Sequence, residues 1–208
     1  MNFSEALKEL RKGKKRNFDQ TLDLIVNLRD LDLRRESLNT SAVLPFAPKK
    51  KKIAAFLENG SEKVDFVITK ADIERMTADD IKKMISEYDF FLANAKLMPL
   101  IAMRFGKILG SAGKMPDPKL GCVLMQESED AVASIVNKLS GTVKIKAKEL
   151  SLKIAIGKES MPDEQLSQNA DAVVSAVAAA LPSNWQNIRS IMLKFTMTKP
   201  LKVKKNEN

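Results

Sequence analysis

Hydrophobic residues follow two different patterns along this chain of 208 residues. Near both ends apolar and polar residues alternate, and they do so over 21–29, 150–156 and 190–197. An alternation with a period of two is typical of a strand that buries one face. These segments therefore predict three strands of a sheet that is covered on one side. A shorter strand is predicted at 40–46.

Continuous apolar runs replace the alternation in the middle of the chain. Three such runs, at 53–57, 64–68 and 88–93, predict strands that are buried on both faces. Helical patterns lie between and after them, at 71–76, 79–87, 98–109 and 127–139. Strands of this kind alternating with helices are typical of a parallel, three-layer α/β unit.

Two details of that unit concern its edges. Residues 141–148 are predicted to form its last, edge strand. The connection over 58–63 is too short for a full crossover helix between its first two strands. Either these two strands are antiparallel, or the unit is trimmed at this point.

The alternating pattern at both ends predicts a discontinuous domain. It consists of residues 1–50 and 150–208, and residues 51–149 are inserted as a second domain. Each terminal segment also contains one predicted helix, at 4–11 and from Pro162 to the residue before Pro182. The predicted fold class is therefore α/β with two domains, one of them split by the other.

The charge of the chain points to a polyanionic partner. There are 35 Lys and Arg against 26 Asp and Glu, which gives a net charge of +9. Residues 1–50 carry +4, residues 150–208 carry +3, and the insert between them carries +2. Nucleic acid is the usual partner of such a chain, and the charge predicts that it binds to the terminal domain.

The composition also disfavours several classes of protein. The chain has no histidine, which is the commonest general base in enzymes, and a single cysteine, Cys122, which excludes an internal disulfide. No apolar run approaches the ~18 residues of a membrane helix, and the first residues lack the pattern of a signal peptide. We expect a cytoplasmic protein that is not bound to a membrane, and one cysteine is too few for a multi-thiolate metal site.

A glycine-rich stretch, 106–113, suggests a phosphate-binding loop, but its spacing fits neither common motif. In a Walker loop the lysine precedes Ser or Thr, whereas Lys114 precedes Met115. The glycines also lack the G-x-G-x-x-G spacing of a Rossmann fingerprint. The stretch therefore favours a turn, although an enzyme using Lys114 and a metal at Asp117 stays an alternative. A general nucleic-acid chaperone that uses only the basic runs is a third.

Several motifs distributed along nearly the whole chain are similar to those of one known family. They are Arg16-Asn17-Phe18 with Thr21, Asp89-Phe90-Phe91, the long run from Leu97 to Lys119, Ile156-Gly157-Lys158, and Thr196-Met197 with Lys202-Val203. Together they resemble the L-one family of large-subunit ribosomal proteins, particularly its archaeal branch. The run from Leu97 to Lys119 is the most specific of them.

This resemblance implies a fold and a function. The fold is a two-layer α/β domain, with an antiparallel sheet and helices, made from both termini, and a Rossmann-like insert. The family binds a kinked segment of large-subunit rRNA and forms the stalk beside the exit site for tRNA. Many members also repress translation of their own mRNA. The resemblance implies no catalytic activity and no cofactor, and we expect a monomer outside the ribosome.

The resemblance also implies which residues contact RNA. Strands that display hydroxyls, a phenyl ring and a thioether suit RNA, which proteins read through shape, 2′-hydroxyls and stacking. The expected contacts are Phe18, Thr21, Ser190, Thr196 and Met197, with Lys15, Arg16, Lys194 and Lys202 on phosphates. Taken alone, Phe18 could equally be a core aromatic residue, and Thr196 a solvent-facing strand residue. Thr198 is also an expected RNA contact. It and Lys199 stand where the family usually has Gly-Pro, which the RNA approaches closely.

Overall fold

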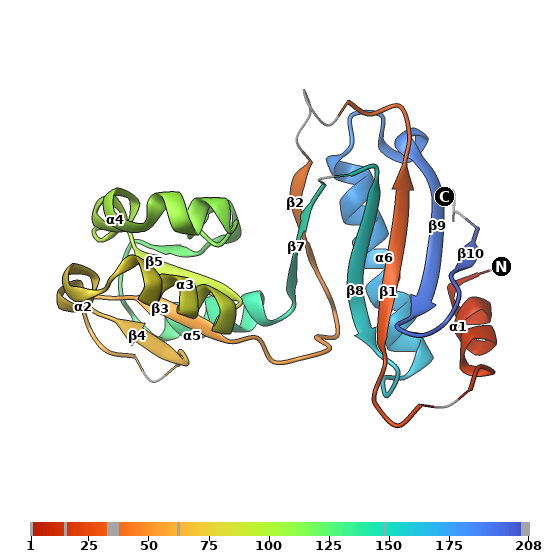
Figure 1. Cartoon of the computed structure of the whole chain (residues 1–208), viewed down its shortest axis with the longest axis horizontal. Helices are drawn as coiled ribbons and strands as arrows, with labels where there is room; N and C mark the ends of the chain where they lie inside the picture. Colours follow the sequence, from red (N-terminus) through yellow and green to blue (C-terminus); the bar gives the residue numbers. More distant parts are fainter. Residues whose placement is uncertain (1, 15, 33–37, 62, 148, 205–208) are drawn as a thin grey trace. The chain divides into compact units, whose positions relative to one another are not determined.

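The computed structural model describes residues 2–14, 16–32, 38–61, 63–147 and 149–204. The chain divides into two compact units, Met1–Pro48 with Gly141–Asn208, and Lys49–Ser140 (Figure 1). One unit contains an antiparallel sheet and the other a parallel sheet, each packed against helices. The predicted fold class is confirmed.

The first unit is built on a four-stranded antiparallel sheet in the order β10-β9-β1-β8. The strands are β1 (Thr21–Leu28), β8 (Ser151–Lys158), β9 (Ile188–Phe195) and β10 (Leu201–Val203). Along β1, Leu22, Leu24 and Val26 are buried and the residues between them are partly exposed, as the alternation predicted. One face of the sheet therefore belongs to the core, and we call the opposite one the open face.

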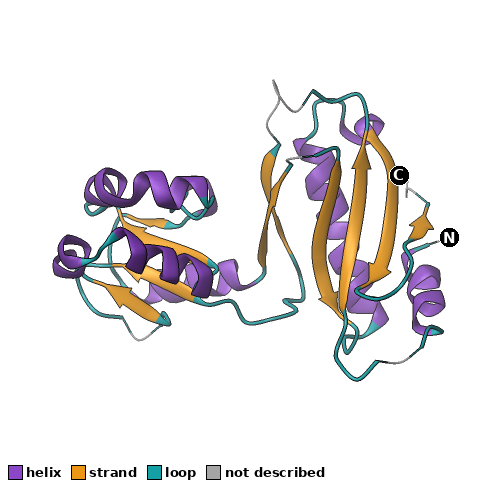
Figure 2. Ribbon diagram, viewed as in Figure 1, coloured by secondary structure: helices purple, strands orange, loops and turns teal. Residues whose placement is uncertain are grey.

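Helices α1 (Phe3–Arg11) and α6 (Asp163–Ala180) contribute to the same core as the sheet. Figures 1 and 2 show α6 running along one face of the sheet, which makes two layers. The close packing of α6 on β8 depends on Gly157, because a Cβ at this position would collide with Leu166. Arg11 joins the end of α1 to the other helix through its bond to Asp163 at 2.6 Å.

A separate two-stranded ribbon corrects one prediction. Strands β2 (Asn39–Val43) and β7 (Thr142–Lys146) pair with each other in antiparallel fashion. The prediction that 141–148 is the edge strand of the parallel sheet was wrong, although Lys148 itself lies outside the described residues. The physical reason is that Ile145 and Ala42 are buried in the core of the first unit. The first unit accordingly resumes at Gly141.

The second unit is a three-layer α/β structure, as predicted. Its parallel sheet has the order β4-β3-β5-β6 and consists of β3 (Ile53–Phe56), β4 (Phe66–Ile68), β5 (Phe90–Asn94) and β6 (Val123–Leu124). The helices are α2 (Lys70–Arg75), α3 (Ala78–Glu87), α4 (Met98–Ser111) and α5 (Glu129–Ser140).

Successive residues of the buried strands face two different cores. On β3, Ala54 and Phe56 pack with α2, α3 and α4, whereas Ile53 and Ala55 pack with α5. The continuous apolar runs are therefore explained by helices on both faces. Strands β3 and β4 are parallel although no described helix connects them, so the trimmed alternative is correct. The two-residue strand β6 was not predicted.

The glycine-rich stretch ends α4, as the turn interpretation predicted. Gly113 has a φ of 68°, a backbone conformation that favours glycine. The backbone N–H of Lys114 then donates to the carbonyl oxygen of Leu109 at 2.9 Å, which closes the end of the helix.

Candidate nucleic-acid interface

The start of β1 and the turn after β9 lie side by side and are joined by reciprocal hydrogen bonds. The backbone N–H of Thr21 donates to Thr196 Oγ1 at 3.1 Å, and the backbone N–H of Thr196 donates to the Thr21 carbonyl at 3.1 Å. The Thr196 hydroxyl also donates to that carbonyl at 3.3 Å. These bonds bring together residues that are 175 positions apart. The Thr196 hydroxyl thus has a structural role, while the Thr21 hydroxyl has no partner among the described residues.

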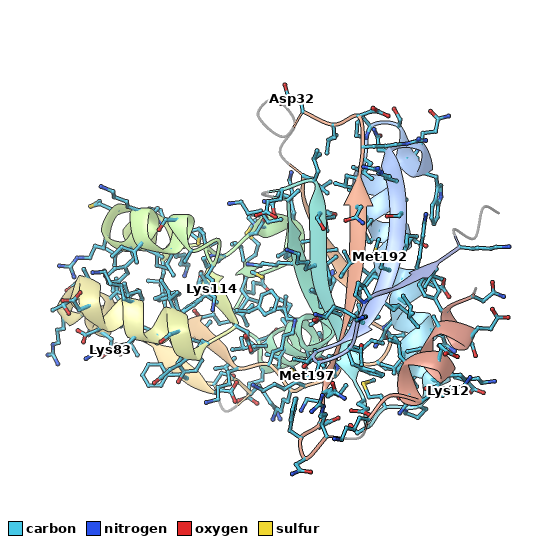
Figure 3. The ribbon with its side chains drawn as sticks, turned by 45° about the vertical axis from the view of Figure 1, so that its right-hand side comes forward. Lys12, Asp32, Lys83, Lys114, Met192 and Met197 are labelled. Carbon is cyan, nitrogen blue, oxygen red and sulfur yellow. The ribbon has the colours of Figure 1, made fainter. Side chains whose placement is uncertain are left out.

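Two large apolar side chains project into solvent at this end of the sheet. Phe18 is 52 % exposed and Met197 is 58 % exposed. Figure 3 labels Met197, which lies in the turn that follows β9. The alternative that Phe18 is a core aromatic residue is therefore wrong. Exposed aromatic and thioether groups on a basic unit are suited to stacking against nucleotide bases.

The segment that carries Phe18 is fixed through its neighbour, Asp19. The two carboxylate oxygens of Asp19 accept from the backbone N–H and the hydroxyl of Ser160, each at 3.0 Å. Lys158 Nζ lies 3.5 Å from the same carboxylate. Desolvation alone would raise the pKa of Asp19, but the Ser160 hydrogen bonds and the Lys158 charge bring it below its ordinary value. The segment before β1 is therefore anchored to the turn between β8 and α6.

Gln20 is a site residue that the sequence reasoning missed. It is only 3 % exposed, and its Oε1 accepts from the backbone N–H of Met197 at 3.1 Å. Its Nε2 donates to Glu159 Oε2 at 3.0 Å. Gln20 thus fixes the backbone of Met197. Its position in the sequence could have indicated this role. Residue 20 is two positions before Leu22 and therefore faces the core, where a polar side chain needs a hydrogen-bond partner.

The Thr198 side chain folds back onto its own turn. Its hydroxyl accepts from the backbone N–H of Phe195 at 2.9 Å and donates to the Phe195 carbonyl at 3.3 Å. Its methyl carbon lies 3.8 Å from the place where a Cβ on Gly13 would be. The basic segment after α1 therefore adjoins the turn. The side chain of Thr198, at a position where the family usually has glycine, is held by these hydrogen bonds to Phe195.

The predicted cations and Ser190 are distributed more widely. Arg16 is exposed before β1, whereas Lys15 lies outside the described residues. Lys194 is directly opposite Asp23 on the open face, and Lys202 on β10 is opposite Met192. Burial raises the pKa of Asp23 above its ordinary value, and the Lys194 charge counteracts this shift.

Ser190 lies at the far end of the open face from Phe18. It is opposite Asn27, whose amide Nδ2 donates to the Ser190 hydroxyl at 2.9 Å. The structure therefore gathers Phe18, Thr21, Thr196, Met197 and Thr198 at one end, while Lys194, Lys202 and Ser190 lie farther along the open face.

The residues of the enzyme alternative have local structural partners. Lys114 Nζ donates to the carbonyl oxygens of Ile85 and Tyr88, both at 2.6 Å, at the end of α3. Asp117 accepts from the backbone N–H of Lys119 at 2.9 Å. Within the described ranges, no group of three or more acidic, histidine or cysteine side chains could hold a metal ion. No helix in these ranges is long and apolar enough to cross a membrane.

A carboxylate occupies the carboxyl end of the parallel sheet, where related folds bind phosphates. Glu127 accepts from the backbone N–H groups of Glu58 at 2.7 Å and Asn59 at 2.9 Å. It also accepts from the amide of Asn94 at 2.6 Å. Desolvation opposes ionisation, but these hydrogen bonds lower the pKa of Glu127 below its ordinary value. The Glu127 carboxylate thus accepts from the backbone N–H groups that would otherwise be available to a phosphate.

Comparison with known proteins gives one consistent family. Residues 10–199 match the model of the Ribosomal protein L1p/L10e family. The chain is similar to the large ribosomal subunit protein uL1 of Nanoarchaeum equitans, with 36% identity over 96% of this chain and 98% of that protein. It is also similar to the protein of the same name from Methanothermococcus thermolithotrophicus, with 32% identity over 98% of this chain and 98% of that protein. For Pyrobaculum calidifontis the identity is 35%, covering 99% of this chain and 92% of the relative.

Proposed function

The chain belongs to the Ribosomal protein L1p/L10e family, and from this premise we propose that it binds the stalk region of large-subunit rRNA beside the tRNA exit site. It is a structural protein of the large ribosomal subunit and is located in the cytoplasmic ribosome. The proposed binding surface is the end of the first unit's sheet that carries Phe18, Thr21, Thr196 and Met197.

One observation carries this assignment. Phe18 and Met197 are exposed, yet the backbone on which each stands is fixed, through Asp19 and Gln20 respectively. Other large apolar side chains, such as Phe66 and Met125, are also exposed, so exposure alone does not identify a site. At Phe18 and Met197, however, the exposed groups adjoin each other's strands on the basic unit and stand on a fixed backbone, which gives an RNA-binding protein preorganised stacking surfaces. Residues of the first unit also carry +7 of the net charge of +9, by count over the unit's two segments.

Each group has a distinct role in the proposed complex. Phe18 and Met197 pack against unstacked bases, and the unpartnered Thr21 hydroxyl bonds to a 2′-hydroxyl or a base edge. Arg16, Lys15 and Lys194 contact phosphates, which set the register of the RNA more than its sequence. The Thr198 hydroxyl, which is bonded to Phe195, closes the turn instead of contacting the RNA directly.

The same surface would also serve regulation. An mRNA segment that copies the shape of the rRNA site would meet the same side chains, so we propose that the protein represses its own message by competition. We further propose contact with tRNA at the exit site, a monomeric state outside the ribosome, and no catalytic activity.

The test is binding of the full chain to an rRNA stalk fragment at several salt concentrations. With ~6 phosphates neutralised, affinity should fall by about 10³ between 50 and 200 mM salt. An unrelated hairpin should bind much more weakly. Affinity that ignored salt would overturn the proposal, and equal affinity for both RNAs would favour a general chaperone. Titration with ATP or GTP and magnesium tests the enzyme alternative, for which we expect no binding.

A further inference from the structure

The open face of the sheet has a depression at the end remote from Phe18. Its volume is about 650 Å³, and its lining includes Asn27, Ser151, Ser190, Leu150, Arg189 and Lys202. Asn27 is six positions after Thr21 on β1, which corresponds to roughly 20 Å at ~3.3 Å per residue. The depression is therefore a different place on the sheet from the end that carries Phe18 and Met197.

Polar side chains from three neighbouring strands form the floor of this depression. Asn27 is opposite Ser151 on β8 and Ser190 on β9. The Ser151 hydroxyl donates to Asn27 Oδ1 at 2.8 Å, and Asn27 Nδ2 donates to the Ser190 hydroxyl at 2.9 Å. This chain of bonds fixes the orientation of the amide. Among the described residues, one amide hydrogen of Asn27 and the hydroxyl hydrogen of Ser190 have no acceptor, so both can donate to a ligand.

The rim of the depression combines apolar and cationic groups. Leu150 is 46 % exposed, and Met192, labelled in Figure 3, is partly exposed on the open face. Arg189 and Lys202 are exposed, and neither has an ion-pair partner among the described residues. Glu149 is the acidic member of the lining. Because the rim is mainly apolar and cationic, an acidic ligand with a flat apolar part fits it best.

We propose that this depression holds a single nucleotide of the bound RNA. The base lies against Leu150 and Met192, its edge accepts from Asn27 and Ser190, and its phosphate contacts Arg189 and Lys202. This inference rests on the proposed function and deepens it. The RNA then has two separate anchors on the open face, an aromatic one near Phe18 and a polar pocket near Asn27.

The first test is NMR titration of the full chain with adenosine and uridine monophosphates, and separately with inorganic phosphate. The proposal predicts millimolar binding of a nucleotide, with shifts at the backbone amides of Asn27, Ser151 and Ser190. Phosphate alone should give weaker shifts. Equal effects of phosphate and nucleotide would show an anion site only, and no shifts with any probe would exclude the pocket. Neither result depends on whether the rRNA fragment binds.

The second test is rRNA binding by an Arg189→Gln, Leu150→Ala variant. We expect a tenfold to hundredfold rise in Kd and an unchanged melting temperature, since both side chains are exposed. Lys83→Gln on α3, labelled in Figure 3, removes one charge from the second unit and should change Kd less than twofold. If the double variant fails to fold, Arg189→Gln alone decides, with an expected rise of about fivefold. Wild-type affinity in the folded variant would overturn the proposal.

Discussion

Gln20 provides a sharp test of how the binding surface is fixed. A Gln20→Leu variant keeps a buried side chain of similar size but removes both hydrogen bonds, to the Met197 N–H and to Glu159. A partly buried N–H left without an acceptor costs about 1 to 3 kcal/mol, and the buried leucine offsets part of this. We therefore expect the free energy of unfolding to fall by about 1 to 2 kcal/mol.

The effect on RNA binding follows from the loss of preorganisation. Without the bond from Gln20, the backbone at Met197 must be ordered when RNA binds, at a cost of about 1 to 2 kcal/mol. This corresponds to a roughly fivefold to thirtyfold rise in Kd. The assays are filter binding to the rRNA fragment and urea unfolding of the same preparations. Gln168→Leu is the matched control, because Gln168 is exposed on α6, and we expect wild-type values for it.

An exchange of the two side chains distinguishes positioning from general destabilisation. In a Gln20→Glu, Glu159→Gln variant, the carboxylate at position 20 accepts both from the Met197 N–H and from the amide at position 159. We expect this variant to bind RNA nearly as tightly as the wild type. Wild-type affinity in Gln20→Leu, or no recovery in the exchanged variant, would refute the reasoning.

Three further predictions concern stability. Glu127→Gln should destabilise the chain by about 1 to 3 kcal/mol at pH 7. Because the folded pKa of Glu127 is depressed, the contribution of the carboxylate is fully present above the ordinary value of 4.5 and is lost as the pH falls through the folded pKa, so the difference from the wild type in urea unfolding should be larger at pH 7 than at pH 3. Gly157→Ala should lower the free energy of unfolding by about 1 to 3 kcal/mol, because the new Cβ collides with Leu166. Leu166→Ala made in the Gly157→Ala background removes this collision, so it should cost less than the ~2 to 5 kcal/mol that Leu→Ala costs in a wild-type core. Thr198→Gly should lower the melting temperature, because it removes both hydroxyl bonds to Phe195, and unchanged melting would contradict their role.

The sequence predicted the sheets from local patterns, and the misses arose where a partner distant in sequence decides the outcome. Alternation identified β1, β8 and β9 because each strand buries one face in the same core. The strand at 141–148 was assigned to the wrong sheet, because pairing with β2 depends on a segment about 100 residues away, to which no local pattern points. Strand β6 has two residues, too few for any periodicity.

The candidate site was predictable only in part. Resemblance to a family selected Phe18 and Met197, and the structure shows both exposed. It could not select Gln20, whose role comes from hydrogen bonds across 139 and 177 positions of sequence. Nor could it show that Thr196 and Thr198 use their hydroxyls within the fold, since the presence of a threonine in the sequence gives no indication of its bonding partner.

The most direct test of the account compares two pairs of exposed side chains. The first variant carries Phe18→Ala and Met197→Ala. The second carries Phe66→Ala and Met125→Ala in the second unit. All four substitutions remove a large exposed apolar side chain. A stacking contact contributes about 1 to 3 kcal/mol, so the first variant should bind the rRNA fragment at least tenfold more weakly than the wild type. The second should retain wild-type affinity. Equal affinities for the two variants would contradict the claim that the end of the sheet carrying Phe18 and Met197 binds RNA.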